Sequence, residues 1–377
     1  MVQSKQFFRD TWAEVELAHV KYNVQEVRKN FQQDMHVMAV VKADGYGHGA
    51  VPVAEAALEA GASFLSVNLL DEALRLREAG IEAPILVMGR IRPEDVGIAV
   101  RHNLSITVFQ IEWLQEAKQY MKEQDSLKLH VKIDSGMGRI GTVTAEELSQ
   151  LLQVIETDQA FQLEAVYTHF ATADELDNSY WEKQYGRFLS RLKVVEEICG
   201  MPPFIHCGNS ATGLRFPEHC FNMFRFGISM YGLLPSDDIE DELPFELKRA
   251  FSLHSQLVQV KQLPKGEGIS YGATYTTSGD EWIGTVPIGY ADGWYRYHSS
   301  EGGTVLVDGE RAPIIGRICM DQLMVRLPYQ LPVGTKVTLI GKQGEDEITI
   351  QEIASRLKTI SYEIPCMISS RVPRLYV

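Results

Sequence analysis

An eightfold alternation of strand-like and helix-like segments between residues 37 and 230 is the feature that most constrains how this chain can fold. The strand-like segments are short apolar runs, typical of strands buried on both faces of a parallel sheet. Helical periodicity fills the intervals, and Gly61, Gly80 and Gly200 follow helical segments as C-terminal caps often do. The strand-like segments are residues 37–41, 64–67, 85–88, 106–109, 129–133, 163–168, 204–206 and 223–226. The clearest helical segments are residues 50–60, 71–79, 112–122, 145–155 and 179–198.

Eight consecutive strand–helix units predict an α/β fold of the (β/α)8 TIM-barrel type. An open, doubly wound sheet uses the same alternation but seldom has eight units in a row. The acidic stretch 235–244 then interrupts the pattern and is typical of a linker. We expect a cofactor-binding barrel domain over residues 12–240 and a mostly β domain over residues 241–377, which residues 1–11 join. The β domain is indicated by strand-like segments at 254–261, 282–288, 304–307, 324–327, 336–340 and 374–377, with one helical stretch at 351–357.

Composition narrows the class of function. A formal net charge of −14 opposes binding to nucleic acid or to an anionic membrane surface, so we expect a small-molecule ligand held by local donors. The five cysteines are scattered, without the spacing of a disulfide framework or a zinc site, and no metal site is expected. Neither a secretory leader nor a membrane span is apparent, and we expect a cytoplasmic protein.

Polar side chains recur at the ends of the predicted barrel strands, where the chemistry of TIM barrels takes place. Any one of them alone is more often solvated or ion-paired than catalytic, but five strand ends in register are not explained that way. Lys42 is the most informative, because an amine between a buried strand and a glycine-rich loop is placed to hold an aldehyde cofactor as a Schiff base. The others are Lys132, Asp134, Arg139, His169, His206, Asn209, Ser210, Arg225 and Gly227.

Two glycine-containing segments compete as phosphate-binding sites. The run from Gly136 to Gly141 matches the dinucleotide fingerprint, but the following helical pattern begins only near Thr144, so the run does not open directly into a helix. We therefore favour Ser210 together with the backbone amides after the eighth strand, where barrels often hold a phosphate.

Nine motifs, in order along essentially the whole chain, carry a family resemblance. They are AVVKADGYGHG, KIDSGMGRIG, THFATAD, HCGNSA, RFGISMYG, SYGATY, PIGYADG, GRICMDQ and SRVPR. Together they resemble the bacterial alanine racemases of the pyridoxal-phosphate-dependent, fold-type III group. The resemblance implies racemisation of L- and D-alanine, a supply of D-alanine for peptidoglycan, and a homodimer in which the β domain of one subunit completes the active site on the barrel of the other.

By this resemblance, Lys42 holds the cofactor and acts as base on one face of the substrate Cα, and Tyr271 of the partner chain acts on the opposite face. Racemisation removes a proton from one face and returns one to the other, so two opposed acid/base groups are the direct solution. Arg139 and His169 are expected to favour the phenolate of Tyr271. Arg225 is implied to donate to the cofactor's ring nitrogen without protonating it, which restrains the ring as an electron acceptor.

The remaining assignments also follow from the resemblance. Lys132 matches a lysine that is often carbamylated, which would let it orient Arg139. The phosphate is implied to bind Tyr46, Ser210, Gly227 and Ile228, and the substrate carboxylate to bind Arg139 and the amide of Met320. Supporting residues are Lys132, Asp134, Asp321 and Tyr290, and the entry corridor is expected to contain Tyr290, Arg296, Arg317, Asp174 and Ile368.

Ser370 departs from the family pattern, which commonly has a tyrosine there that contacts the phosphate and narrows the site. We therefore expect some relaxation towards serine, and a broader amino-acid racemase stays open as an alternative. A fold-type III decarboxylase is opposed by Arg225 and Tyr271, because such enzymes usually pair the ring nitrogen with a carboxylate and use a cysteine base. A non-catalytic cofactor-binding protein would not need the β domain.

Overall fold

The computed structural model describes residues 7–31 and 35–377, and the chain divides into two compact units. The barrel unit comprises His19–Gly45 and Ala50–Lys248. The β unit comprises the N-terminal residues up to Ala18, Tyr46–Gly49 and Arg249–Val377. The barrel unit thus begins at His19, beyond the expected residue 12, because the N-terminal strand pairs within the sheet of the β unit.

Eight parallel strands close into a barrel, which confirms the predicted fold class. Closure is made by β2, whose Ala39 lies opposite Leu65 on one side and Phe226 on the other. Met38, Phe64, Leu86 and Met223 form a buried apolar cluster inside the barrel. The strands are β2 (His36–Val40), β3 (Phe64–Val67), β4 (Ile85–Val87), β5 (Leu104–Val108), β6 (Leu127–Lys132), β7 (Phe161–Tyr167), β8 (Phe204–His206) and β9 (Met223–Phe226).

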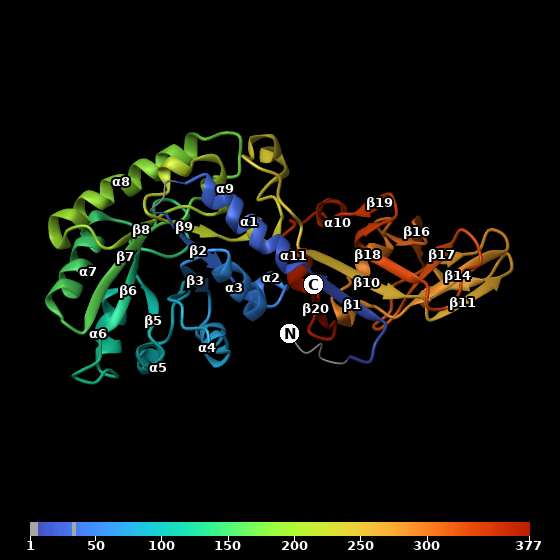
Figure 1. Ribbon diagram of the computed structural model, residues 1–377, viewed down its shortest axis with the longest axis horizontal. Coiled ribbons are helices and arrows are strands. Elements are labelled where there is room, and N and C mark those ends of the chain that lie inside the picture. The colour runs from blue at the N-terminus through green and yellow to red at the C-terminus, as the bar shows by residue number, and fades with distance from the viewer. Residues whose placement is uncertain (1–6, 32–34) are drawn as a thin grey trace. The chain divides into compact units, whose positions relative to one another are not determined.

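Amphipathic helices lie around the barrel strands (Figure 1). In α7, residues spaced by three and four positions, from Leu148 to Ile155, form the buried face, and Thr144 caps the helix by accepting from the Glu147 amide. The first helix, α5 and α9 were not among the predicted segments. The helices are α1 (Leu17–Lys29), α3 (Ala50–Glu59), α4 (Leu70–Glu78), α5 (Val96–Arg101), α6 (Ile111–Lys118), α7 (Ala145–Thr157), α8 (Ser179–Cys199) and α9 (Ser210–Arg215). Short 3-10 turns are η1 (Pro93–Asp95), η2 (Pro217–His219), η3 (Ile228–Tyr231) and η4 (Asp237–Glu242).

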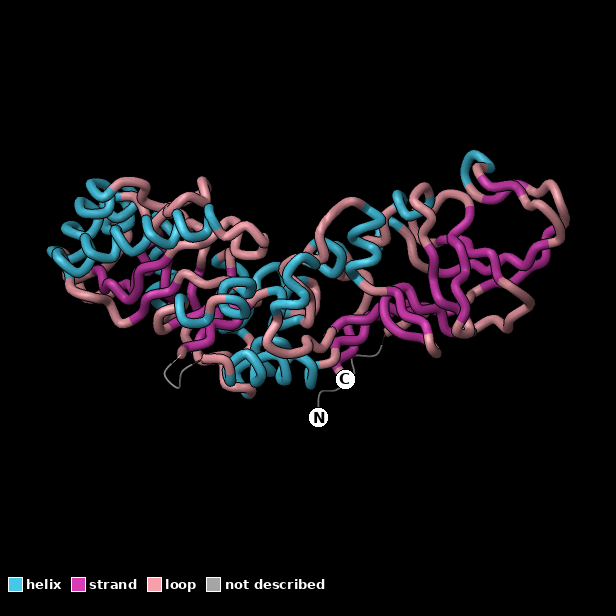
Figure 2. Tube along the Cα trace, turned by 90° about the horizontal axis from the view of Figure 1, so that it is seen from above, coloured by secondary structure: helices cyan, strands magenta, loops and turns pink. Residues whose placement is uncertain are grey.

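The β unit is built mainly from strands, as Figure 2 shows in magenta. Its large sheet has the order β11-β14-β17-β16-β15-β18-β10-β1-β20, with β19 beside β18, and β12 pairs with β13. The strands are β1 (Thr11–Val15), β10 (Phe251–Gln256), β11 (Gln259–Leu263), β12 (Gly268–Ile269), β13 (Tyr275–Thr276), β14 (Glu281–Val286), β15 (Thr304–Val307), β16 (Glu310–Ile315), β17 (Leu323–Leu327), β18 (Lys336–Gln343), β19 (Asp346–Ile348) and β20 (Arg374–Tyr376). The helical segments are α10 (Ile350–Leu357), α11 (Glu363–Met367), η5 (Tyr271–Ala273), η6 (Tyr290–Asp292) and η7 (Arg296–Ser299).

The expected single strand over residues 254–261 is two strands. β10 pairs with β18, whereas β11 pairs with β14, and the backbone changes partner at Leu257 and Val258. The Leu257 amide donates to Thr335 and the Val258 amide donates to Thr285, which marks the change. Continuous β propensity in the sequence could not indicate this break, because propensity carries no information about pairing partners.

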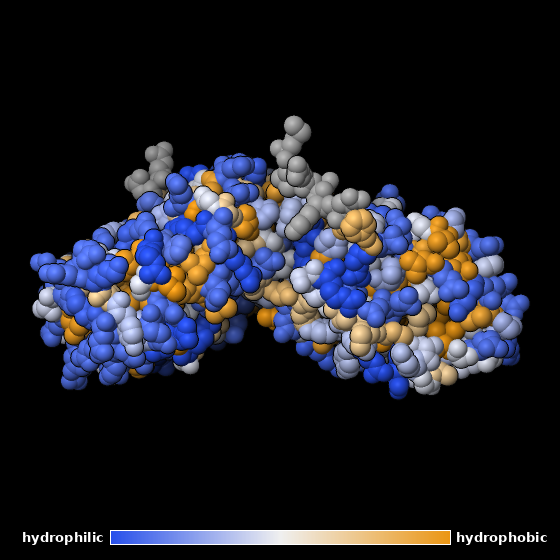
Figure 3. Space-filling model, turned by 90° about the horizontal axis from the view of Figure 1, so that it is seen from below, coloured by the Kyte–Doolittle hydropathy of each residue, from blue (hydrophilic) through white to orange (hydrophobic). Residues whose placement is uncertain are grey.

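The surface carries both hydrophilic and hydrophobic residues. Hydrophilic residues are interspersed with smaller hydrophobic groups on the face drawn in Figure 3. Among the described residues, no helix combines the length and apolar character that a membrane crossing requires. All five cysteines are free, and two of them, Cys207 and Cys220, are buried.

Candidate active site

Lys42 follows strand β2 and begins a short turn, α2 (Lys42–Tyr46), with unusual backbone geometry. Ala43, Asp44, Gly45 and Tyr46 all have φ between 51° and 61°, in the left-handed region. Each non-glycine residue in this conformation costs about 1–2 kcal/mol. Such a run persists only where the surrounding structure holds it, and strain of this kind is concentrated at functional sites.

Two carboxylates and one backbone bond hold the turn. Oε1 of Glu72 accepts from the Ala43 amide at 2.6 Å, while its Oε2 accepts from the Asn68 and Leu69 amides. Asp44 accepts from the Ala50 amide at 3.0 Å. The Gly45 amide donates back to the carbonyl of Val41 at 2.9 Å. The backbone that carries Lys42 is therefore fixed on both sides.

Arg225 projects from β9 into the barrel interior, where it is 3% exposed. Its Nη1 donates to Nδ1 of His206 at 2.7 Å. Its Nη2 donates to Nδ1 of His169 at 3.1 Å and to the Thr168 carbonyl at 2.9 Å. Within the part of the chain that the structure describes, its Nε hydrogen has no acceptor. A ligand that brings a neutral acceptor, such as a pyridine nitrogen, would satisfy it.

Positive charge gathers around Tyr167, which sequence analysis did not single out. Nζ of Lys132 lies 4.1 Å from the centroid of the Tyr167 ring, and Cζ of Arg225 lies 5.4 Å from it. Burial, reinforced by Arg225 and Arg139, holds the pKa of Lys132 well below its ordinary value. Burial also raises the pKa of Tyr167 to about 12, so its ring serves as a neutral cation–π partner. Tyr167 lies in a strand that the sequence predicted to be buried, where an aromatic residue is common, so its type alone did not indicate a contact with these cations.

His169, at the end of β7, is held as a neutral ring. Its Nδ1 accepts from Arg225, so its proton is on Nε2. Burial lowers the pKa of His169 well below the ordinary value, and Arg225 and Lys132 lower it further. A cofactor beside Arg225 would therefore meet a neutral hydrogen-bond donor at this position.

A cradle of donors lies at the ends of β8 and β9. Oγ of Ser210 accepts from the amides of Gly227, at 3.1 Å, and Ser229, at 3.4 Å. The hydroxyl of Ser229 is buried and has no partner among the described residues. Asn209 instead caps α9 by accepting from the Thr212 amide. Backbone amides and hydroxyls after the last strands suit a phosphate, so the group expected from the sequence fits these residues.

The loop that carries Arg139 turns around Asp134. This carboxylate accepts from the backbone amides of Gly136, Gly138 and Arg139. The bonds outweigh the effect of burial and lower the pKa of Asp134. Since α7 begins only at Ala145, the glycine run is a closed loop and not a dinucleotide fingerprint.

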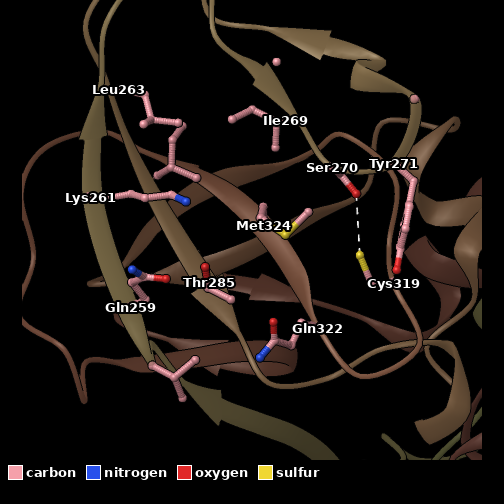
Figure 4. A pocket seen from close by; sticks show the side chains of 14 residues that line it. Gln259, Lys261, Leu263, Ile269, Ser270, Tyr271, Thr285, Cys319, Gln322 and Met324 are labelled. Carbon is pink, nitrogen blue, oxygen red and sulfur yellow. Dashed lines mark hydrogen bonds between the residues drawn. The ribbon is translucent and has the colours of Figure 1, made fainter.

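In the β unit, Tyr271 lies on a second strained turn. Ser270 and Ala273, neither of them glycine, have φ of 64° and 45°. Oγ of Ser270 donates to the Arg317 carbonyl at 2.5 Å and lies 3.5 Å from Sγ of Cys319. Tyr271 is 69% exposed and lines an open pocket of about 940 Å³. Figure 4 shows its side chain at the edge of this pocket. A phenol held on strained backbone, yet uncovered, fits a reactive group better than a core residue.

The other predicted residues of the β unit lie on neighbouring loops. The amides of Tyr290 and Ala291 donate to the carbonyls of Cys319 and Met320, which joins the two loops. Asp321 accepts from Arg371 at 2.7 Å.

Asp292 connects these loops, although sequence analysis did not single it out. Its carboxylate is fully buried, bonds Arg9 through both oxygens and accepts from the Gly289 amide at 3.0 Å. Its backbone carbonyl accepts from the amide of Ser369. Asp292 is the aspartate of the PIGYADG motif, but the motif by itself did not indicate that its carboxylate is buried against Arg9.

Tyr46 belongs to the β unit, although it is only four residues from Lys42. Its ring centroid lies 6.3 Å from that of Tyr362, and burial raises the pKa of its hydroxyl. Ser370 is exposed. The predicted site residues therefore form two groups. Tyr46, Tyr271, Tyr290, Met320 and Asp321 lie in the β unit, as do the corridor residues Arg296, Arg317 and Ile368, and the remainder lie in the barrel unit.

Comparison with known proteins identifies the family. The family models described as alanine racemase N-terminal domain and alanine racemase C-terminal domain match residues 15–235 and 250–376. The chain belongs to the alanine racemase family. It is 58% identical to an alanine racemase of Halalkalibacterium halodurans, covering 98% of this chain and 96% of that protein. It is 56% identical to an alanine racemase of Geobacillus stearothermophilus, covering 98% and 94%.

A solved structure agrees with these sequence matches. The crystal structure of alanine racemase from Bacillus anthracis with bound L-Ala-P superposes with a TM-score of 0.96 at 50% identity, covering 99% of this chain and 96% of that one. The alanine racemase family is pyridoxal-phosphate-dependent, so the cofactor expected from the sequence is that of the family.

Proposed function

We propose that this chain interconverts L-alanine and D-alanine with pyridoxal phosphate, using Lys42 and Tyr271 as opposed acid/base groups. The arrangement of Lys42, Arg225 and the Ser210 cradle at one end of a single barrel supports this proposal most directly. When bound, the cofactor withdraws electrons from the substrate Cα and so makes its proton acidic. The proposed role is to supply D-alanine for peptidoglycan in the cytoplasm.

The barrel unit supplies most of the cofactor site in this proposal. Lys42 provides the amine for covalent attachment, and Arg225 provides its unpaired Nε hydrogen to the ring nitrogen. Because arginine stays protonated at neutral pH, it donates this hydrogen bond without giving up a proton. The phosphate is assigned to Ser210, Gly227 and Ile228 together with Tyr46. His169 and His206 fix the arginine from behind, and Asn209 holds the start of α9.

Lys42 and Tyr271 move the proton. One takes it from Cα and the other returns one on the opposite face, so the configuration inverts. A tyrosine is an ordinary acid with a pKa of about 10, and its phenolate needs nearby cations or donors to form near neutrality. We assign that role to Arg139 and His169. Arg139 and the Met320 amide are also proposed to hold the substrate carboxylate, which places Cα between the two bases.

We also propose that the functional form is a homodimer, with Tyr271, Met320 and Tyr290 contributed to the partner's barrel. The uncovered Tyr271 and the open pocket beside it support this, since a catalytic phenol needs water excluded around it. Asp321 would then help hold Met320 through its bond to Arg371.

An isotope-exchange experiment tests the two-base assignment. The purified protein is incubated with L-alanine or D-alanine in deuterium oxide, and chirality and Cα deuteration are followed together. We expect Lys42→Ala to be inactive with both enantiomers. Tyr271→Phe should lose roughly 10²–10⁴-fold in racemisation while it still exchanges the hydrogen of one enantiomer. Exchange of both enantiomers at the wild-type rate in Tyr271→Phe would refute the assignment.

Subunit mixing tests the homodimer. If Lys42 and Tyr271 of one site come from different chains, inactive Lys42→Ala and inactive Tyr271→Phe proteins form mixed dimers with one intact site each. Unfolding and refolding an equimolar mixture should then recover about a quarter of wild-type activity, since half of the dimers are mixed. No recovery from a mixture that refolds to dimers would mean that both bases act within one chain.

A further inference from the structure

A line of hydrogen-bonded side chains crosses the barrel interior from Arg225 to Ser105. Arg225 donates to Nδ1 of His206 at 2.7 Å, and Nε2 of His206 lies 3.0 Å from Nδ1 of His130. Nε2 of His130 lies 2.9 Å from Oε2 of Glu164, which also accepts from the hydroxyl of Ser105. All five residues are buried, with exposures of 8% or less. Apart from Arg225 and His206, none of them was assigned a role in the proposed site.

The strand β7 is distorted at the point where Glu164 enters the line. Opposite β6, Leu129 pairs with Leu163, whereas the next residue, His130, pairs with Ala165. Glu164 is therefore the extra residue of a β-bulge. Such bulges locally disrupt strand pairing and often re-aim one side chain. The backbone of β7 departs from regular pairing where this carboxylate meets His130.

The two ends of the line determine where each imidazole proton lies. A guanidinium can only donate, so Nδ1 of His206 accepts and its proton is on Nε2. This proton points to Nδ1 of His130, which must accept, so the proton of His130 is on Nε2. A carboxylate can only accept, and Glu164 receives that last proton. Every bond therefore runs in the same direction, from the arginine to the carboxylate.

The electrostatics agree with this assignment. Burial lowers the pKa of His206 well below its ordinary value, and Arg225 lowers it further, so this ring is neutral. Burial likewise lowers the pKa of His130, against the opposite influence of Glu164. Burial alone would raise the pKa of Glu164, but the bonds from His130 and Ser105 outweigh it. Lys128 is the other charged group near the carboxylate, with Nζ 3.9 Å from Oε1.

We propose that His130 and Glu164 are positioning residues for Arg225, which keep His206 as a hydrogen-bond acceptor and so aim the free Nε hydrogen at the cofactor ring. The inference rests on the proposed pyridoxal phosphate site. A His206 ring with its proton on Nδ1 would oppose the donor of Arg225 and turn the guanidinium away. Glu164 prevents this tautomer because it accepts the proton of His130, which leaves Nδ1 of His130 to accept from His206. Its effect thus reaches Arg225 through two imidazole rings. The proposed role requires Glu164 to accept the hydrogen bond from His130, and it does not require the negative charge of the carboxylate.

The direct test is ¹⁵N NMR of histidine-labelled enzyme with bound cofactor, with signals assigned through His130→Gln and His206→Gln variants. We expect both rings to be neutral, with the proton on Nε2, across pH 6–8. An Nδ1–H form or an imidazolium at either ring would overturn the inference. This readout does not depend on turnover. If the labelled wild type shows these tautomers but does not racemise alanine, the proposed function fails while the hydrogen-bond assignment stands.

Two substitutions of Glu164 separate acceptance from charge. Glu164→Gln retains an acceptor oxygen for His130, whereas Glu164→Leu removes it. We expect Glu164→Gln to keep the His206 tautomer, with cofactor affinity and kcat within about twofold of wild type. Glu164→Leu should lose the fixed tautomer, bind pyridoxal phosphate about tenfold more weakly and lose about tenfold in kcat with little change in KM.

Ser105→Ala serves as the matched control, since it removes one donor to Glu164 but leaves the bonds that join Arg225, His206, His130 and Glu164. Its His206 tautomer, its affinity for pyridoxal phosphate and its kcat should equal those of the wild type. Equal behaviour of Glu164→Leu and Glu164→Gln would refute the positioning role. If Glu164→Leu does not fold, the tautomers of the wild-type enzyme and the cofactor affinity of Glu164→Gln still decide the matter.

Discussion

At the scale of single residues, burial changes the chemistry of Lys132. A lysine on the surface is protonated at neutral pH and does not act as a nucleophile. Lys132 is 3% exposed, and its pKa is held well below the ordinary value by burial and by the neighbouring cations Arg225 and Arg139. A larger fraction of its amine is therefore neutral.

We predict that Lys132 forms a carbamate, in which the neutral amine adds to carbon dioxide and releases one proton. In ¹³C-labelled bicarbonate the enzyme should show a carbamate resonance that is absent from Lys132→Met. The loss of an anion beside Arg139 should also lower kcat/KM about tenfold, or ~1.4 kcal/mol. Lys118→Met removes an exposed lysine, paired with Asp158, and should keep the resonance. A wild-type spectrum without the resonance would contradict the prediction.

A second prediction at this scale concerns Ser370. The family pattern commonly has a tyrosine here, and a serine leaves more volume. Between two substrates that differ by one small group, as alanine and serine do, a pocket can discriminate by about 1–3 kcal/mol. We predict that Ser370→Tyr raises the ratio of kcat/KM for alanine over serine by about tenfold. Ser369→Ala changes the neighbouring hydroxyl and should alter the ratio less. An unchanged ratio in Ser370→Tyr would remove the case for relaxed specificity.

At the scale of elements, both proposed bases lie on turns that L-residues rarely adopt. Lys42 precedes a left-handed run at residues 43–46, and Tyr271 lies between Ser270 and Ala273, both with positive φ. Regular strands could not present these side chains in the same way, because a strand alternates its side chains between two faces. The strain has to be balanced by bonds from outside each turn.

Glu72 supplies the clearest of these bonds. Glu72→Ala removes the acceptors of three backbone amides, and we predict a loss of about 1–3 kcal/mol in the free energy of unfolding of the barrel unit. It should also lower kcat, because the backbone of Lys42 is less well held. Asp71→Ala is the matched control, since Asp71 lies in the same first turn of α4. Urea unfolding and alanine turnover measure both effects. Equal losses in the two variants would mean that Glu72 acts only on its own helix.

At the scale of the whole molecule, the barrel interior contains histidines that stay neutral. Burial lowers the pKa values of His130, His169 and His206, so the folded state binds fewer protons than the unfolded state below about pH 6.5. Unfolding then takes up protons as the pH falls. The free energy of unfolding therefore decreases as the pH falls below about 6.5, towards the lowered pKa values of the folded state.

We predict that the urea midpoint of the cofactor-loaded protein falls between pH 7.5 and pH 5.5. Each such histidine can contribute up to about 1.4 kcal/mol per pH unit below pH 6.5. His130→Gln should reduce the slope, whereas His102→Gln, which changes a half-buried residue outside the interior, should leave it unchanged. A midpoint that is constant over this range would contradict the neutral-histidine assignment.

Much of the fold was predictable because its signals are local. The alternation of apolar runs and amphipathic segments predicted all eight barrel strands, and Thr144 correctly marked the start of α7. Local signals did not predict the features that depend on which strands pair. The strand predicted at 254–261 is split, and β1 lies in the sheet of the β unit although it precedes the barrel in the chain. Strand pairing joins residues that are far apart in sequence, so no window of sequence contains it.

The amino-acid sequence was enough to predict the barrel, the β-rich second half and the family, and it pointed to Lys42, Arg225 and Ser210 as chemically significant. Those inferences needed only residue type, spacing and motif order. The way in which the side chains act on one another became visible in the folded chain. The lowered pKa of Lys132, the contact of its amine with the Tyr167 ring and the line from Arg225 to Glu164 depend on burial and on contacts across strands. Protonation and hydrogen-bond direction depend on each group's surroundings in the folded barrel, and those surroundings come from distant parts of the chain.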